Sequence, residues 1–290
     1  MDIRAILAGL AFAFMWSSAF TSARIIVAAA PPLTALSLRF LISGLLGVLI
    51  AWMLGQSWRL TRAQWRATIV FGVCQNALYL GLNFVAMQTI EASLAAIIAS
   101  TMPLLVALAG WIFFGERVGT LGLLGLVAGV IGVFIIMGAR LQGGIDMTGL
   151  GLCVLGVIAL TFATLMVRGA TSGGNFLMVV GLQMLVGSAV LSVAAISTET
   201  IVISWSWKLI AAFSYTTLIP GLAATLVWFW LVNRIGAVKA ATFHFLNPFL
   251  GVAIAALILG ENLGLREVMG VAVIALGILA VQLSKQKRKA

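Results

Sequence analysis

One stretch of this chain occurs twice, and the repeat constrains the fold more than any other feature of the sequence. A long apolar run over residues 94–119 has one proline near its centre and closes on Gly-Glu, and residues 239–264 repeat this arrangement. A shift of 145 residues, half the chain, superposes identical residues without a gap at Ala95, Ala96, Pro103, Leu105, Gly115, Glu116, Gly119, Gly125 and Gly132. A fixed internal period of this kind indicates a duplicated structural unit.

The composition places both copies in a membrane. The chain is 63% hydrophobic and 8% charged, with a mean hydropathy of +1.20, whereas a soluble domain carries about 25% charged residues. Its net charge of +10 comes from basic residues in short loops and a tail. They form no basic face, so we expect no nucleic-acid partner and interpret them as determinants of membrane topology.

The apolar runs predict ten spans, because a membrane helix needs about 20 apolar residues. The predicted spans are residues 4–28, 33–54, 64–87, 92–114, 119–139, 148–168, 174–196, 208–232, 237–259 and 264–284. The predicted fold is therefore an all-α membrane protein of two five-helix repeats, residues 1–140 and 148–284, with a basic tail at residues 285–290.

The basic residues predict the orientation of these spans. With the N-terminus in the cytoplasm, twelve Lys and Arg residues lie on the inner side and five on the outer side. This bias predicts that both termini are cytoplasmic. Because each repeat has an odd number of helices, the second repeat enters the membrane inverted. Inverted repeats around a central cavity are typical of secondary transporters that work by alternating access.

The two copies, together with motifs in the first two spans, resemble the EamA family of the drug/metabolite transporter superfamily. The segment AFMWSSAFTSARI (residues 13–25) resembles the first-helix motif of that family, with Ser17 where a glycine is usual, and LSLRF (residues 36–40) resembles its arginine-containing second helix. The resemblance covers essentially the whole chain. It implies ten helices, a central cavity and export of metabolites across the cell (inner) membrane. Within the family, this chain is similar to the exporters of aromatic and other apolar amino acids.

The third span carries the clearest candidate for a binding surface. Gln75, Asn76, Tyr79 and Asn83 share one face of a regular α-helix. Polar groups in a membrane must face the protein interior, because an unsatisfied amide is costly in hydrocarbon. We predict that this stripe lines the cavity. The alternative is that it forms hydrogen bonds between helices.

Aromatic and hydroxyl side chains lie near the middle of other spans. Trp16, Ser17 and Phe20 lie in the first span, and Phe162 lies at the equivalent place in the sixth. Such side chains suit the apolar body and the polar end of an amino acid, whereas plain packing is the alternative for the two large rings, Trp16 and Phe162.

Three prolines, Pro103, Pro248 and Pro220, are predicted to kink their spans and to act as hinges. Thr101 lies just before the first of them, and His244 and Asn247 lie just before the second. These three polar residues are candidate substrate ligands. A proline also frees the carbonyl four residues earlier, which here belongs to Ala99 and to His244.

Arg39 lies about two turns into the second span, where a charge is costly. It is predicted either to bind the carboxylate of a substrate or to snorkel toward the interface. Glu116 and Glu261 follow the two apolar runs and are expected to bond neighbouring helix ends. No carboxylate lies at mid-membrane, so ion coupling stays open.

An intramembrane enzyme is excluded by what the chain lacks. It has one histidine and no HExxH motif, and both aspartates lie outside the predicted spans. We expect no cofactor and no metal, with membrane lipid and a small-molecule substrate as the partners. The predicted function is export of amino acids (aromatic, methionine, threonine-like), with a multidrug efflux carrier or a lipid-carrier flippase as alternatives. Glycine seams on the fifth and tenth spans predict close packing within a monomer or a weak homodimer.

Overall fold

The chain forms ten long apolar helices, as so uncharged a sequence must do in lipid. The computed structural model describes residues 3–115, 119–142, 144–166, 174–262 and 264–287. In these residues, ten helical stretches are long and apolar enough to cross a membrane, which confirms the predicted fold class. Each span satisfies most of its backbone N–H and C=O groups along its own length, because hydrocarbon offers them no partner.

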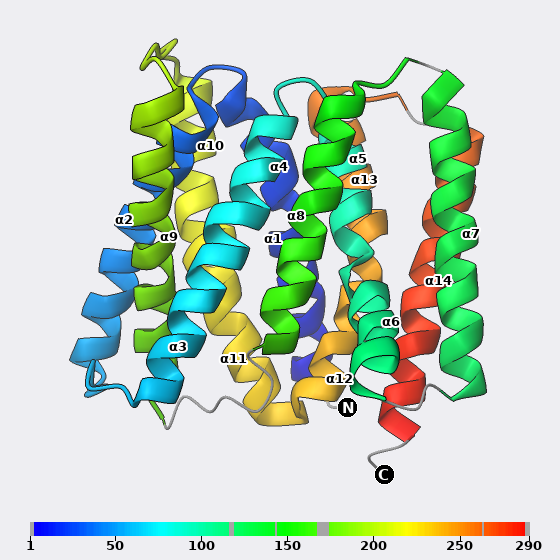
Figure 1. Ribbon diagram of the computed structural model, residues 1–290, viewed down its shortest axis with the longest axis horizontal. Helices are drawn as coiled ribbons and strands as arrows, with labels where there is room; N and C mark the ends of the chain where they lie inside the picture. The colour runs from blue at the N-terminus through cyan, green and yellow to red at the C-terminus, as the bar shows by residue number, and fades with distance from the viewer. Residues whose placement is uncertain (1–2, 116–118, 143, 167–173, 263, 288–290) are drawn as a thin grey trace. The chain divides into compact units, whose positions relative to one another are not determined.

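Six spans are single uninterrupted helices (Figure 1). They are α1 (Ile3–Val27), α2 (Pro32–Met53), α7 (Thr120–Gln142), α8 (Met147–Met166), α9 (Phe176–Thr198) and α14 (Leu265–Lys287). The other four consist of shorter segments in sequence. They are α3 (Arg62–Phe71) with η1 (Gly72–Tyr79) and α4 (Leu80–Ala86); α5 (Ala92–Ser100) with α6 (Met102–Phe114); α10 (Trp207–Leu218) with η2 (Ile219–Ala223) and α11 (Ala224–Ile235); and α12 (Ala237–Ala241) with η3 (Thr242–Leu246) and α13 (Asn247–Leu259).

Packing divides the chain into two compact units, and neither coincides with one half of the sequence. Unit 1 consists of Met1–Thr21, Thr89–Leu150 and Ala223–Ala290. Unit 2 consists of Ser22–Gln88 and Gly151–Leu222. Each unit therefore combines helices from the first and second halves of the chain.

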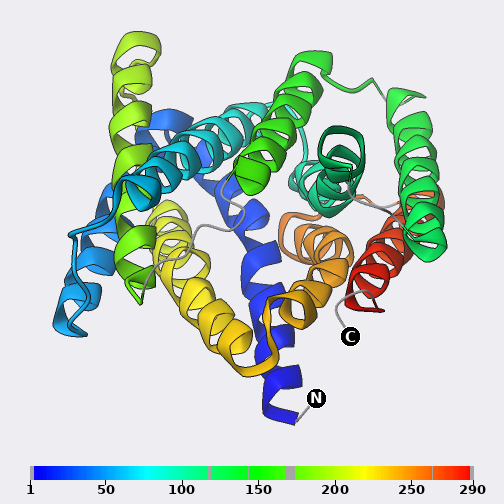
Figure 2. The same ribbon diagram turned by 60° about the horizontal axis from the view of Figure 1, so that its bottom comes forward.

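Within unit 1, α7 and α14 lie side by side along a seam of glycines (Figures 1 and 2). A Cβ atom at Gly125 would lie 2.6 Å from the Gly277 carbonyl oxygen, and the reverse distance is also 2.6 Å. Gly132 and Gly270 approach each other in the same way, at 2.8 and 2.9 Å. A shift of 145 residues exchanges these two pairs, so the contact is symmetric between the halves. Side chains here would force the helices apart.

Two glutamates hold the N-termini of helices, one in each unit. The carboxylate of Glu261, after α13, accepts the backbone N–H groups of Ala92 and Ser93 at the start of α5, at 2.8 and 3.0 Å. The carboxylate of Glu199, after α9, accepts two backbone N–H groups at the start of α2 and the hydroxyl of Thr34, all at 2.8 Å. A negative charge at a helix N-terminus satisfies unpaired N–H groups and complements the helix dipole.

These carboxylate contacts show how equivalent spans of the two halves are arranged. Each joins the start of a span in the first half to the end of its equivalent in the second half, so both pairs run antiparallel, as inverted repeats require. At the other end of the α2–α9 pair, the side-chain oxygen of Gln56 accepts the N–H of Met178 at 3.0 Å. The contact predicted for Glu261 is confirmed, whereas Glu116 lies outside the described residues.

Each of the three prolines lies where its span is interrupted. Pro103 is the second residue of α6, and only Thr101 separates α6 from the end of α5 at Ser100. Pro248 is the second residue of α13 and follows the tight 3-10 turns of η3. Pro220 lies in η2, whose turns are those of a π-helix. The missing N–H of proline removes a hydrogen bond at each point.

The third and eighth spans contain wide π-helical turns at equivalent places. η1 covers residues 72–79, and the 145-residue shift moves this range onto 217–224, which contains η2. The prediction of regular α-helices across residues 64–87 and 208–232 is wrong in these segments. A π-helical turn is held by its surroundings and is frequent at functional sites. For η1 the surroundings are α9, where a Cβ at Gly72 would lie 2.8 Å from the Gln183 carbonyl oxygen.

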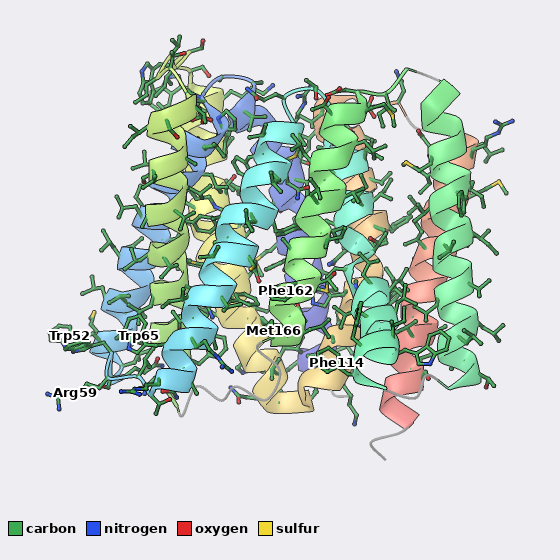
Figure 3. All side chains as sticks on the ribbon, viewed as in Figure 1. Trp52, Arg59, Trp65, Phe114, Phe162 and Met166 are labelled. Atoms are coloured by element: carbon green, nitrogen blue, oxygen red, sulfur yellow. The ribbon has the colours of Figure 1, made fainter. Side chains whose placement is uncertain are left out.

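Tryptophans mark the ends of the spans. Trp58, Trp205 and Trp207 are 64%, 74% and 84% exposed, as expected for anchors at a membrane interface. Figure 3 shows Trp52 and Trp65 together with Arg59 at one end of unit 2, where α2 ends and α3 begins. That end carries the arginines that the charge bias assigns to the cytoplasm.

The loop before α8 is fixed by one carboxylate outside the spans. Asp146 accepts the hydroxyl of Thr89 at 2.6 Å and the backbone N–H groups of Thr148 and Gly149 at 3.1 and 3.0 Å. These hydrogen bonds, that of Thr89 foremost, lower the pKa of Asp146 below its ordinary value. The contact begins α8 and ties it to the loop that leads into α5, within unit 1.

Candidate functional site

The predicted site residues fall into two groups, one in each unit. Unit 1 contains Trp16, Ser17, Phe20, Thr101, His244 and Asn247, and unit 2 contains Arg39, Gln75, Asn76, Tyr79, Asn83 and Phe162.

Unit 1 brings four rings from three spans together, and we call them the ring cluster: Phe12, Trp16, Trp228 and His244. The centroid of Phe12 lies 5.7 Å from Trp16, 4.8 Å from Trp228 and 5.4 Å from His244. His244 also lies 5.3 Å from Trp228 and 6.4 Å from Trp16. Two of its contacts, those with Phe12 and Trp16, are edge-to-face, a favoured geometry for aromatic pairs. α1, α11 and η3 are thus joined around one imidazole.

The ring cluster has a polar edge on the side of α13. The amide nitrogen of Asn247 lies 2.9 Å from Nδ1 of His244. With the amide nitrogen as donor, Nδ1 accepts, and a neutral imidazole carries its proton on Nε2. The hydroxyl of Ser17 lies 3.4 Å from the Asn247 carbonyl oxygen and 3.5 Å from Oδ1. These contacts link α1 to the start of α13 and fix the orientation of the imidazole.

Two members of the ring cluster were missed by the sequence analysis. Phe12 lies one helical turn before Trp16, so the i, i+4 spacing of two rings was a usable signal. Trp228 lies in the eighth span, and nothing in its local sequence distinguishes it from an interface tryptophan. Only the packing of α11 against α1 and η3 identifies it.

The remaining unit 1 residues are bonded within their own helices or buried. Phe20 is 8% exposed, and the hydroxyl of Thr101 donates to the Ile98 carbonyl at 2.6 Å. The carbonyl of His244, which the position of Pro248 predicted to be free, accepts the backbone N–H of Asn247 three residues later. The prediction of a free carbonyl is therefore wrong for His244, because a 3-10 turn replaces the lost α-helical bond. For Ala99 it stays a prediction, since the N–H of Thr101 bonds to the Ile98 carbonyl at 3.1 Å.

In unit 2, two of the four polar residues of the third span bond to protein. Nδ2 of Asn76 donates to the Gln183 carbonyl oxygen of α9 at 2.9 Å. Nδ2 of Asn83 donates to the Tyr79 carbonyl at 2.7 Å, and its Oδ1 accepts from Sγ of Cys153 at 3.3 Å. For these two asparagines, the helix-packing alternative describes the observed contacts.

The other two polar residues of this stripe have polar groups left over. Gln75 is partly exposed, and its amide bonds to none of the residues that the structure describes. Tyr79 is 3% exposed, and its hydroxyl likewise has no partner in the described part of the chain. Both lie in η1, whose wide turns change the angular spacing that the sequence analysis assumed. Phe162 is 50% exposed and projects from α8, as does Met166 (Figure 3).

Arg39 is buried in unit 2 and has no counter-charge. It is 6% exposed, and its Nε has no acceptor. Its Cζ lies 5.2 Å from the ring centroid of the adjacent Phe40. Oγ1 of Thr21, in unit 1, also has no partner among the described residues. Buried polar groups are nearly always bonded, so both positions need an explanation.

No group of three His, Cys, Asp or Glu side chains in the described part of the chain is placed to hold a metal ion. The polar groups of the candidate residues are amides, hydroxyls, an indole, an imidazole and a guanidinium. Such groups bind and orient a solute by hydrogen bonds and charge.

Comparison with known proteins places the whole chain among transporters. The sequence model of the EamA-like transporter family matches residues 3–138 and again residues 147–283. The uncharacterized transporter YvbV of Bacillus subtilis is 27% identical over 277 residues, which cover 95% of this chain and 90% of that protein. The uncharacterized inner membrane transporter YedA of Escherichia coli is 27% identical over 281 residues, which cover 93% and 88% of the two chains.

The fold is also similar to that of a solved protein. A crystal structure of another protein superposes with a TM-score of 0.70 over 98% of both chains, at 19% sequence identity. This similarity supports the arrangement of the helices along the whole chain.

Proposed function

Because the chain belongs to the EamA-like transporter family, and is thus a multi-pass membrane transporter rather than an enzyme, we propose that it exports small metabolites, and amino acids in particular. Aromatic amino acids, methionine and threonine are the expected substrates. The expected location is the cell (inner) membrane, with both termini in the cytoplasm. Export proceeds by alternating access, in which the solute is exposed to one side of the membrane at a time.

The ring cluster of unit 1 is the observation that supports this substrate class. Its four rings present an apolar, polarisable surface of the kind that stacks against an aromatic or thioether side chain. Its polar edge places the hydroxyl of Ser17 and the amide of Asn247 beside the rings, and their oxygens keep acceptor capacity beyond the bonds that they form with each other. An amide or hydroxyl oxygen binds an ammonium group without a buried carboxylate.

Flux into proteoliposomes tests the proposal. Labelled phenylalanine, methionine and threonine are offered to purified full-length protein, with and without a pH gradient. A carrier gives flux that saturates and that is accelerated by substrate on the opposite side. Stimulation of the flux by the pH gradient would show that transport is coupled to protons. His244 would then be the first titratable residue to substitute.

A pair of tryptophans on one helix provides the matched control. Trp228→Ala removes a ring of the cluster, whereas Trp230→Ala removes a ring that is 42% exposed and stacks with Arg234. We expect Trp228→Ala to weaken phenylalanine flux by at least about 2- to 13-fold, since one buried aromatic contact is worth about 0.5–1.5 kcal/mol beyond the apolar area it buries. Trp230→Ala should leave flux unchanged. Equal flux in both variants would remove the ring cluster from the transport path.

Flux measurements in the same vesicles distinguish amino acid export from the two alternative functions. A multidrug carrier moves bulky lipophilic cations in preference to amino acids, and a lipid-carrier flippase moves a headgroup across the bilayer without amino acid flux. Absence of saturable flux for all three amino acids, with transport of either other class, would overturn the proposal.

A further inference from the structure

We propose that Arg39 is the anion-binding residue of the transport path and that its ligand is the carboxylate of the transported solute. The inference rests on the proposed function and narrows it, because it requires every good substrate to carry a carboxylate. Neutral amines and amino alcohols of the same shape are then excluded as good substrates.

The burial of Arg39 excludes snorkelling. The residue follows the start of α2 by seven positions, or about 10 Å along the helix axis at 1.5 Å per residue, and it is 6% exposed. Arg24 of α1 behaves differently, since its guanidinium donates to the carbonyl of Met87 at the end of α4. Arg24 therefore has a protein acceptor at a helix end, and Arg39 does not.

Arg39 has no anion to pair with in the residues described. No carboxylate in this part of the chain forms an ion pair with it, and Nε has no acceptor of any kind. A guanidinium cannot release its proton to escape the cost of burial. Charged side chains inside membrane proteins are expensive and are found where function requires them. A ligand that supplies a negative charge resolves this cost during each transport cycle.

The duplication shows that helix packing does not require a charge at this position. The residue 145 positions later is Met184 of α9, which is 8% exposed. The equivalent place in the second half is thus filled by an uncharged side chain of similar length. A charge on only one half of a duplicated fold points to a solute that is itself charged at one end.

The guanidinium lies beside a glycine of an irregular helix. A Cβ atom at Gly221 of η2 would lie 3.8 Å from Nη2 of Arg39 and 3.2 Å from both Oγ of Ser43 and the Thr216 carbonyl oxygen. A side chain at this position would therefore crowd Ser43 and Thr216 and contact the guanidinium. Irregular backbone at membrane depth is tolerated where it is buried in protein or lines a water-filled cavity. The planar guanidinium matches a carboxylate with two parallel N–H···O bonds.

The experiment compares each amino acid with its carboxyl-reduced alcohol in proteoliposomes of the full chain. L-phenylalanine is compared with L-phenylalaninol, which keeps the ring and the ammonium group and loses the carboxylate. We expect the parent protein to prefer phenylalanine by about 10- to 100-fold, the range for a charge-assisted hydrogen-bonded pair. Arg39→Met should reduce that preference to near one, and Arg39→Lys should retain part of it.

Two further measurements keep the result interpretable. Arg24→Met is the matched control, because it removes an arginine of unit 2 that has a protein acceptor. We expect it to lower the midpoint of thermal unfolding but to leave the preference unchanged. In detergent, saturating phenylalanine should raise the unfolding midpoint of the parent and not that of Arg39→Met. If Arg39→Met does not fold, the parent protein still tests the proposal through its preference for phenylalanine over phenylalaninol. Equal transport of the two compounds by the parent overturns the proposal.

The outcomes separate this inference from the proposed function. If 3-phenylpropionate and pyruvate move in an Arg39-dependent way and amino acids do not, the carboxylate site stands and amino acid export falls. If inorganic phosphate, and not a carboxylate, competes with the transported solute, the assignment of a carboxylate ligand to Arg39 is overturned. If amino acids are transported and Arg39→Met keeps the full preference for the acid, export stands and Arg39 is a structural residue.

Discussion

Neighbouring residues on one helix have different roles here, and Asn76 and Gln75 are the clearest example. Both are amides in η1 of the third span. The Asn76 side chain donates to the Gln183 carbonyl of α9, and a Cβ at Gly187 would lie 2.4 Å from Cβ of Asn76. The Gln75 amide has no partner among the described residues. One amide therefore holds two helices together, and we propose that the other contacts the solute.

Substitution of each amide by alanine separates the two roles. Asn76→Ala removes an interhelical hydrogen bond, so we expect the free energy of unfolding to fall by about 0.6–2 kcal/mol with little change in transport per folded molecule. Gln75→Ala should leave stability unchanged and weaken transport about 2- to 13-fold, the equivalent of about 0.5–1.5 kcal/mol for one hydrogen bond. Thermal unfolding in detergent and vesicle flux measure the two quantities. Reversal of the two effects would assign the amides the opposite roles.

The same pair shows what the sequence allowed and what it did not. Repeat spacing and apolar length predicted the ten spans and placed the prolines at the breaks that the structure shows. The partner of Asn76 was not predictable, because Gln183 lies 107 residues away and its backbone oxygen carries no sequence signature. Trp228 was missed for a similar reason, since only tertiary packing distinguishes a cluster ring from an interface ring. The wide turns of η1 were not predictable from the sequence, because they depend on contact with α9 rather than on local propensity.

At the scale of helices, close packing depends on glycine where equivalent spans meet. The α7–α14 seam and the two glutamate contacts both join a span to its inverted equivalent. They give the bundle two independent ways to hold antiparallel helices: backbone contact in the middle of the membrane and a capped helix N-terminus at its edge.

The seam predicts a contrast between two glycines of α7. Gly125→Ala places a Cβ atom 2.6 Å from the Gly277 carbonyl oxygen, so we expect a loss of about 1–3 kcal/mol in the free energy of unfolding. Gly138→Ala is the control, since its Cβ would have no atom within 4 Å. It should be neutral or stabilising by up to about 1 kcal/mol, because alanine is the better helix former. Equal midpoints of thermal unfolding for the two variants would show that α7 and α14 do not pack along this seam.

The glutamate at the end of α13 gives a second prediction at this scale. Glu261→Gln keeps one acceptor oxygen but removes the charge and one of the two bonds to the start of α5. Hydrogen bonds to charged groups are worth about 1.5–3 kcal/mol, so we expect a loss of about 1–2 kcal/mol in the free energy of unfolding. Glu199→Gln should behave alike at the start of α2. Unchanged unfolding midpoints for both variants would show that these caps contribute nothing.

At the scale of the whole molecule, the duplication and the basic residues predict one topology. α1 begins and α14 ends at the same end of unit 1 (Figure 1), and five spans separate Gln142 from the N-terminus. The excess of Lys and Arg assigns the cytoplasm to the end that holds both termini. The loop at Gln142 then faces the opposite side.

Reporter fusions check this arrangement directly. A fluorescent protein that matures only in the cytoplasm should be bright after the C-terminus and dark after Gln142, and alkaline phosphatase should give the reverse pattern. Moving the positive charges tests the cause: replacing Arg59, Arg62 and Arg66 by Gln should produce some molecules of the opposite orientation, because these residues form one quarter of the twelve on the inner side. If the fusions after Gln142 and after the C-terminus report the same compartment in the parent, the second half crosses the membrane an even number of times. The two halves would then not be inverted repeats of five spans each, and the antiparallel pairing of equivalent spans would need another origin.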